Sequence, residues 1–309
     1  NVLISTGNST ITASNTVAVG YQALTALTSG SNNTAVGYQA VNALTTGSNN
    51  TAVGYQALNS VSGSHNTAIG RLAGYSLTSG SINTIIGYNA GYNLTSSGSN
   101  VLIGGQAGEA ISGGSGKNIS IGNTSMRNVS NDGAFSVAIG DEAFRYGTGD
   151  NTVAIGHQAA KGASGSTSNN TVAVGYQALN SLESGEGSIA VGYHAGYSNT
   201  SGARNASLGY QANYAITTGS NNTGVGWQAN RFNVTTSNNT GVGYLANSRS
   251  TGSNNTAIGA EAAEGVIGSS TFSNTVAVGY RAGTALTTGG SNILIGYQAG
   301  SSLTTESNK

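Results

Sequence analysis

The chain has 309 residues, and ten Lys and Arg balance ten Asp and Glu, so its formal net charge is zero. Such a balance creates no long-range field, which excludes nucleic acid and anionic membranes as partners recruited by charge. Cysteine is absent and no apolar run is long enough to span a membrane. Disulfides, thiolate metal sites and membrane insertion within this segment are therefore excluded, and we expect no cofactor.

A string close to NTAVGYQA, as at residues 33–40, recurs from one end of the chain to the other. Its glycine aligns in seventeen registers spaced 16 to 20 residues apart, most often 17. Neither half has a composition of its own, so we expect residues 1–309 to form a single repeat domain, and the start in mid-pattern suggests a fragment of a longer fibre chain. The alignment glycines are Gly20, Gly37, Gly54, Gly70, Gly87, Gly104, Gly122, Gly140, Gly156, Gly175, Gly192, Gly209, Gly226, Gly243, Gly259, Gly279 and Gly296.

The three residues before each alignment glycine predict a short strand. The residue directly before the glycine is Val, Ile or Leu in all seventeen registers, and the residue two positions earlier is Thr, Val or Ile in all but one. The residue between them is usually small, as Ala35 is. This alternation over β-branched residues indicates a strand with two different faces, and the period of a helix is missing.

Two further columns are nearly constant. Asn, Ser or Thr stands before every strand, and we expect it to form a recurrent tight corner because Asn tolerates left-handed backbone and bonds its own neighbouring backbone. Three residues after the glycine comes Ala in sixteen registers. We expect this Ala and the small residue in the middle of the strand to form a surface for close packing between chains.

Each unit thus consists of a strand, a corner, a second extended segment and a polar turn, and one unit cannot bury its own apolar face. Stacked units would place like residues over like residues, which predicts an all-β, parallel β-solenoid of about 17 coils. Leucine-rich repeats are longer, and the calcium-binding nonapeptide roll needs an Asp in every turn, whereas this chain has three Asp in all. Both of these architectures are excluded.

The core of such a coil is narrow. Each coil offers about three sizeable aliphatic side chains, worth roughly 1.5–3 kcal/mol each when buried. Ordering the backbone costs roughly 1–2 kcal/mol for every residue of the coil. This small margin predicts that the chain associates with copies of itself as a homo-oligomer.

The strings NTVAVGYQA (274–282), NTAIG (66–70) and SVAIGDEA (136–143) resemble the head repeat of YadA-type trimeric autotransporter adhesins. Longer units such as TTGSNNTAVGYQAL (45–58) are similar to the shafts of bacteriophage tail fibres. The resemblance covers essentially the whole chain. It implies a left-handed parallel β-roll, three rolls assembled as an elongated homotrimer, and a role in attachment.

Unit length separates the two groups, because the autotransporter heads use shorter repeats. The longer unit favours a non-enzymatic tail fibre segment of the virion, with other fibre or virion proteins and a host surface glycan or protein receptor as partners. The alternative is the head domain of an adhesin on the bacterial cell surface. An ice-binding solenoid is a third hypothesis, which we disfavour because we expect the Thr that alternates with Val, as at Thr34 and Thr51, to look inward.

The repeat columns also predict structural ladders, in which each residue lies over its counterpart one coil away. The ladder residues that we expect are Val19, Val36, Val53, Ile69, Ile121, Ile155, Val191, Val242, Ile295, Gly37, Gly54, Asn33, Ala40 and Ala57.

Ten of the 15 tyrosines, and Trp227, follow an alignment glycine directly. These rings could stack on sugars, but we favour a structural ladder of ring upon ring. A second, irregular set of tyrosines lies five residues past the glycine and is the better candidate for ligand contact. Together with two phenylalanines from the least regular stretch, the candidate contacts are Tyr75, Tyr92, Tyr197, Tyr214, Phe135 and Phe144.

Longer loops at residues 113–117, 162–169 and 264–272 are a further candidate surface, because insertions in solenoids often carry binding. His65, His157 and His194 have no carboxylate pattern around them. The adjacent Asp141 and Glu142 would point to opposite faces of a strand. We therefore expect neither a metal site nor an enzyme.

Overall fold

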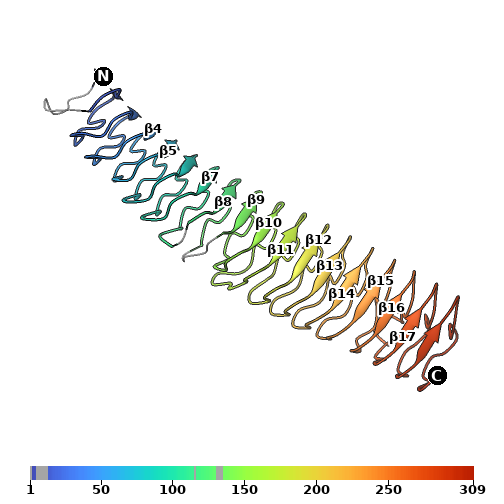
Figure 1. The fold of residues 1–309 in the computed structure, drawn as a ribbon. Helices are drawn as coiled ribbons and strands as arrows, with labels where there is room; N and C mark the ends of the chain where they lie inside the picture. The colour runs from blue at the N-terminus through green and yellow to red at the C-terminus, as the bar shows by residue number, and fades with distance from the viewer. Residues whose placement is uncertain (1, 5–12, 115, 130–134) are drawn as a thin grey trace. The chain divides into compact units, whose positions relative to one another are not determined.

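The computed structural model describes residues 2–4, 13–114, 116–129 and 135–309. The chain divides into two compact units, Asn1–Thr152 and Val153–Lys309. In each unit the strands stand in chain order, and each strand pairs in parallel with the next (Figure 1). The prediction of an all-β, parallel solenoid built from repeats is confirmed in both units.

Every described strand has three residues and ends directly before an alignment glycine, apart from β1. The strands of unit 1 are β1 (Val2–Ile4), β2 (Val17–Val19), β3 (Thr34–Val36), β4 (Thr51–Val53), β5 (Thr67–Ile69), β6 (Thr84–Ile86), β7 (Val101–Ile103), β8 (Ile119–Ile121) and β9 (Val137–Ile139). Those of unit 2 are β10 (Val153–Ile155), β11 (Val172–Val174), β12 (Ile189–Val191), β13 (Ala206–Leu208), β14 (Thr223–Val225), β15 (Thr240–Val242), β16 (Thr256–Ile258), β17 (Val276–Val278) and β18 (Ile293–Ile295).

Strand β1 is the one that the glycine alignment missed. It pairs in parallel with β2, so that Val2 lies opposite Val17 and Ile4 opposite Val19. The sequence has Ser5 where the alignment would require a glycine. The strand was therefore invisible to a search based on glycine, although its three residues follow the same pattern as the others.

The core of a coil is filled by the middle residue of the strand and by three residues after the corner. In the β3 coil these are Ala35, Ala40, Val41 and Leu44, all fully buried. Our expectation that the small residues form a surface between chains is therefore wrong. They are buried within the chain, and the middle position of the strand also holds the larger, equally buried Ile85 and Leu102.

Size is balanced between neighbouring coils. The residue four positions after one alignment glycine packs against the middle residue of the next strand, and where one is large the other is small. A Cβ on Gly91 would lie 2.9 Å from Cδ1 of Leu102, whereas the next coil presents Ala52 to the equivalent Val41. Core volume is therefore balanced in these coils, whereas Gly196 and Ser207, like Ala263 and Ala277, are small in both columns.

The alignment glycines are required by both conformation and space. Gly37 has a φ of 140°, which L side chains rarely adopt, and a Cβ there would lie 2.3 Å from the carbonyl oxygen of Gly54. The glycine column therefore lets the backbones of successive coils touch at the corner that follows each strand.

Buried asparagines form an internal ladder before the strands. Oδ1 of Asn33 accepts a hydrogen bond from the backbone N–H of Asn50 at 2.9 Å, and Nδ2 of Asn33 donates to the carbonyl of Gly47 at 2.9 Å. The left-handed residue of this corner is its neighbour Asn32, with a φ of 60°. Asn33 thus serves the corner through bonds of its side chain to the backbone, as expected, but the left-handed conformation expected of it belongs to Asn32.

Candidate functional site

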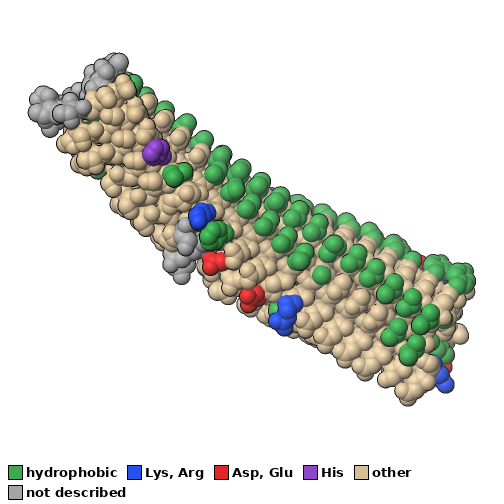
Figure 2. All heavy atoms as spheres, viewed as in Figure 1, with side chains coloured by type: hydrophobic (Ala, Val, Ile, Leu, Met, Phe, Trp, Pro, Cys, Tyr) green, Lys and Arg blue, Asp and Glu red, His purple; other side chains and the backbone are tan. Residues whose placement is uncertain are grey.

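The outward face of the strands is apolar and partly exposed. We call strand face the first and third residues of each strand, which flank the buried middle residue. In β12 these are Ile189 and Val191, whose exposed fractions are 44% and 40%. Within each unit, Figure 2 shows hydrophobic side chains in rows that pass from coil to coil.

The ladder residues expected from the sequence lie in parallel register, but the aliphatic ones face outward. Val36 of β3 pairs with Val53 of β4, and Val53 pairs with Ile69 of β5. Val53 and Ile69 are 37% and 41% exposed. The same position holds Val19, Ile121, Ile155, Val191, Val242 and Ile295, while Asn33, Ala40 and Ala57 are buried.

The threonines of the strand face also point outward. Thr34, Thr51, Thr67 and Thr84 are the first residues of successive strands and pair with one another in register. All four are half-buried, on the side opposite to the buried middle residue. Our expectation that these threonines look inward is wrong, and with it the reason for disfavouring an ice-binding surface.

The tyrosines that follow the alignment glycines form stacks, which we call the tyrosine column. In unit 1 the ring centroids of Tyr21 and Tyr38 lie 5.3 Å apart, and those of Tyr38 and Tyr55 lie 5.2 Å apart. In unit 2 the stack runs from His157 through Tyr176, Tyr193, Tyr210 and Trp227 to Tyr244, with centroid distances of 5.0 to 5.9 Å.

Stacking leaves the ring edges exposed but covers most ring faces. Tyr38 is 43% exposed, yet a neighbouring ring lies parallel to it on each side. A sugar that stacks on an aromatic residue needs a free face. Inside the stacks the geometry therefore favours the ladder interpretation over sugar binding.

The irregular tyrosines form two shorter stacks. The ring centroids of Tyr75 and Tyr92 lie 5.2 Å apart in unit 1, and those of Tyr197 and Tyr214 lie 5.4 Å apart in unit 2. All four are half-buried. The ring centroid of His194 lies 4.0 Å from that of Tyr193 and 4.9 Å from that of Tyr197, so His194 joins the tyrosine column to the shorter stack.

The two candidate phenylalanines differ in burial: Phe135 is on the surface and Phe144 is in the core. Phe135 is 53% exposed, with the ammonium group of Lys117 4.9 Å from its ring centroid. Phe144 is 1% exposed and fills the core position four residues after Gly140. Phe144 is therefore not a ligand contact, because its ring is buried in the core of unit 1.

The long loops differ in how far they are exposed. In the loop 162–169, residues 163–165 are exposed while Ser166 and Ser168 are buried. The loop 264–272 exposes Val266 and Ile267 and buries Phe272 in the core. Ser115 of the loop 113–117 lies outside the described residues, as does Asp132 of the irregular stretch.

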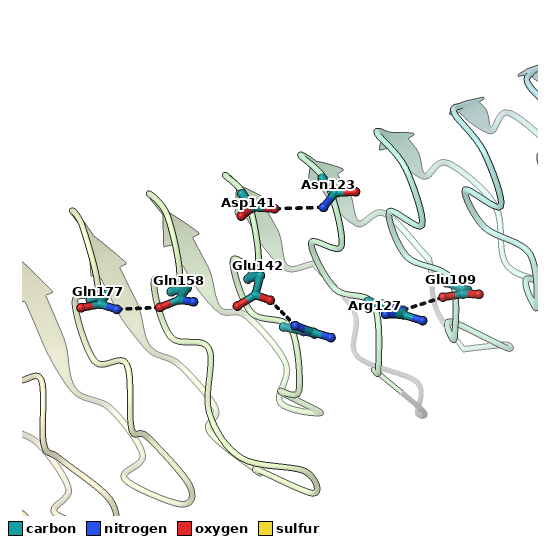
Figure 3. A network of polar contacts seen from close by, with 8 residues as sticks. Glu109, Asn123, Arg127, Asp141, Glu142, Gln158 and Gln177 are labelled. Carbon is teal, nitrogen blue, oxygen red and sulfur yellow. Dashed lines mark hydrogen bonds and ion pairs between the residues drawn. The ribbon is translucent and has the colours of Figure 1, made fainter.

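Charged and amide groups of adjacent coils pair along the surface (Figure 3). Nε of Arg127 lies 2.8 Å from Oε2 of Glu109, and Nδ2 of Asn123 donates to Oδ1 of Asp141 at 3.2 Å. In unit 2, Glu264 is nearly buried beside Arg249, and burial raises the pKa of its carboxyl group. The pairs of unit 1 each bridge two adjacent coils, whereas Glu264 of unit 2 also interacts with the charges of Glu261 and Arg281.

Among the described residues, no group of three or more His, Asp and Glu side chains could hold a metal ion. No helix in the described part of the chain is long and apolar enough to cross a membrane.

Comparison with known proteins identifies no relative. No family model, no curated protein and no solved structure matches this chain. Function must therefore be inferred from the surfaces of the solenoid.

Proposed function

We propose that the chain is a segment of a non-enzymatic attachment fibre, in which identical chains pack through the strand face. The observation that carries the proposal is the column of half-exposed Val, Ile and Leu, which recurs in every coil from Val19 to Ile295. Extended exposed apolar surfaces are typical of protein interfaces.

The strand face is large enough for a stable interface. Each half-exposed aliphatic side chain leaves on the order of 50 Å² uncovered, so the 14 Val, Ile and Leu residues of the strand face in unit 2 offer roughly 700 Å², which is close to what one partner buries in a standard interface. A single unit therefore supplies the area that a specific complex needs.

A second copy of the chain is the occupant that fits this surface best. The outward residues repeat at the spacing of parallel strands, about 4.8 Å, and another copy carries the same columns at the same spacing. Side chains of two copies can then interdigitate over many coils in one register. The absence of net charge removes electrostatic repulsion between copies.

The repeat resembles those of trimeric adhesin heads and phage fibre shafts. This resemblance implies that three chains assemble and that each is wound left-handed. In such a trimer the strand faces would surround the axis, and the polar turns would face solvent. Three chains in one fibre would also present every receptor contact three times, which strengthens weak binding through multivalency.

The longer repeat favours a tail fibre of a virion over an adhesin on a bacterial surface. The neighbouring sequence of the native chain tests this choice. A tail-attachment domain would support the fibre, and a C-terminal β-barrel anchor would support the adhesin.

The assembly is tested by placing charge on the strand face. In the double variant Val191→Lys/Val242→Lys we expect the trimer to dissociate, because two buried ammonium groups per chain would lack partners. Ser184→Lys/Thr235→Lys adds the same charge to two exposed polar turns and is the matched control. Light scattering reports the mass. A wild-type chain that is monomeric, or a double variant that keeps the wild-type mass, contradicts the proposal.

Ice binding is a second candidate, favoured by the outward threonines. Thr223, Thr240 and Thr256 pair in register in unit 2, as Thr34 to Thr84 do in unit 1. The strand faces of other coils carry Val, Ile or Ala at this position, which interrupts the threonine column. A thermal-hysteresis measurement tests this function directly, and we expect no hysteresis if the strand face is covered by other chains.

A further inference from the structure

The tyrosine column is interrupted by a very small residue at one place in each unit. Gly105 follows Tyr88 in unit 1, and Ala260 stands between Tyr244 and Tyr280 in unit 2. Backbone hydrogen bonds fix these neighbours, since Gln106 N–H donates to the Tyr88 carbonyl at 2.7 Å and Glu261 N–H donates to the Tyr244 carbonyl at 2.7 Å. The face of Tyr88 that is turned to the Gly105 coil therefore meets no ring.

The backbone does not require a small residue at Gly105. Its φ lies outside the left-handed range, and an added Cβ would meet only Oδ1 of Asn123, at 3.0 Å. At the preceding alignment glycine, Gly104, a Cβ would lie 2.4 Å from the carbonyl oxygen of Gly122. A tyrosine could therefore stand at Gly105, as it does in most other coils, and its absence leaves an aromatic face open.

A flat group fits between members of this column. At position 71 the column holds an arginine, whose guanidinium carbon lies 5.7 Å from the ring centroid of Tyr55 and 5.4 Å from that of Tyr88. Arg71 thus occupies one face of Tyr88. The opposite face of Tyr88 borders a similar space, and Gly105 has no side chain to fill it.

Polar groups stand one coil beyond each interruption. In unit 1, Asn123 is hydrogen-bonded to Asp141 at 3.2 Å (Figure 3). In unit 2, Nε of Arg281 lies 2.5 Å from Oε2 of Glu261 beside Ala260, and its guanidinium carbon lies 5.3 Å from the ring centroid of Tyr280. Amide, carboxylate and guanidinium groups can donate to and accept from neighbouring hydroxyl groups.

An exposed aromatic face beside such polar groups suits a pyranose ring. The C–H face of the sugar packs on the ring, and its hydroxyl groups bond to the polar side chains. Tyr88 is 50% exposed and Tyr244 is 47% exposed, so both rings are accessible in the chain. We propose that the two interruptions, at Gly105 and at Ala260, are pyranose subsites through which the fibre binds a neutral glycan.

This inference rests on the proposed function, because it names the class of receptor that an attachment fibre would bind. It also assigns the contact to places that differ from the candidates expected from the sequence. The stacked interior of the tyrosine column keeps its structural role, and only its interruptions bind.

Saturation-transfer NMR tests the subsites with the methyl glycosides of glucose, galactose, mannose and N-acetylglucosamine. We expect the wild-type protein to transfer saturation to the C–H face of at least one glycoside. The double variant Gly105→Tyr/Ala260→Tyr fills both spaces with the residue that the column uses elsewhere. We expect binding to weaken at least about fivefold, as loss of an aromatic contact implies.

A second pair of variants separates loss of the ring face from loss of folding. Tyr88→Ala/Tyr244→Ala removes the ring that precedes each interruption and should also weaken binding about fivefold. Tyr38→Ala removes a ring whose two faces are already covered, and it should bind as the wild type does.

The mass of every variant is measured by light scattering alongside binding. Weaker binding at unchanged mass supports the subsites. Wild-type protein that transfers saturation to none of the glycosides overturns the inference, as does a filled double variant that binds normally. A filled variant with altered mass would assign the interruptions to contacts between chains and would also overturn it. The proposed assembly is judged separately, from the mass of the wild type and of the charged variants.

Discussion

Nε2 of His194 lies 2.8 Å from Oε1 of Gln177 in the preceding coil. Both residues stand two positions after an alignment glycine. In other coils this position holds glutamines whose side-chain amides bond to one another, as where Nε2 of Gln228 donates to Oε1 of Gln211 at 2.8 Å. An imidazole therefore takes the place of one amide, and Nε2 must carry its proton to donate to Gln177. Nδ1 of His194 is buried without a hydrogen-bond partner among the described residues.

The first prediction concerns pH. Desolvation by burial lowers the pKa of His194 from its usual value of 6.5, so the unfolded chain takes up the proton first as the pH falls. The stability contributed by the neutral ring is present above pH 6.5 and is lost as the pH falls through the folded pKa. His194→Gln restores the amide ladder, and we expect its melting temperature to fall less between about pH 7.5 and about pH 5 than that of the wild type.

His65→Gln is the matched control, because His65 is exposed. Differential scanning calorimetry across the pH range checks both variants. An unchanged pH dependence in His194→Gln, or an equal change in His65→Gln, would contradict the assignment to His194.

The second prediction tests the balance of size between coils. Gly91→Leu overpacks the core against Leu102 and should cost about 1–3 kcal/mol. Leu102→Ala leaves a cavity and should cost about 2–5 kcal/mol. Because the two positions share one space, the double variant should lose about 1–2 kcal/mol less than the two costs combined. Denaturant unfolding measures this coupling, and simple additivity would show that the two columns do not compensate.

The third prediction concerns the asparagine ladder. Oδ1 of Asn66 accepts from the backbone N–H of Asn83 at 3.1 Å, and its Nδ2 donates to the carbonyl of Gly80 at 2.9 Å. Asn66→Ala leaves these buried groups without partners and should cost about 2–3 kcal/mol. Asn66→Ser should cost less, because Ser136 takes the same position in another coil and still bonds its neighbours. Equal losses in thermal stability for Ala and Ser would refute the role of the side-chain hydrogen bonds.

The fourth prediction is a stabilising substitution. Asn233 is fully buried, and neither polar atom of its amide has a hydrogen-bond partner in the described part of the chain. Leu94 and Ile216 fill the equivalent positions of other coils. We expect Asn233→Leu to raise stability by about 1–3 kcal/mol, measured as a higher unfolding midpoint. A lower midpoint would mean that the amide has a favourable role in the folded chain.

The sequence was sufficient to predict where the strands lie and how they pair. An aliphatic residue stands before every alignment glycine, and a β-branched residue stands two positions earlier in all registers but one, which leaves few alternatives to a parallel solenoid. The direction of the side chains was harder to predict. Alternation of large and small residues, as in Thr34, Ala35 and Val36, is compatible with either face pointing inward, and the narrowness of the coil decides that Ala35 is buried.

The candidate contacts were predicted less well, for reasons that can be stated in physical terms. Phe144 looked irregular in the sequence, but it fills core volume that leucines fill in other coils. The open face of Tyr88 was missed because it is marked by what the next coil lacks, a ring at Gly105. The signal was nevertheless present, since Gly105 and Ala260 interrupt a column of tyrosines.

Packing of identical chains through the strand face is tested most directly by distances between chains. The protein has no cysteine, so Val191→Cys and Ser184→Cys each provide a single site for a spin label. Packed sheets lie about 10 Å apart, and we expect a short, narrow distance between labels at Val191 and a longer one between labels at Ser184. Absence of any dipolar coupling between chains at Val191, or a shorter distance at Ser184, would contradict assembly through this face.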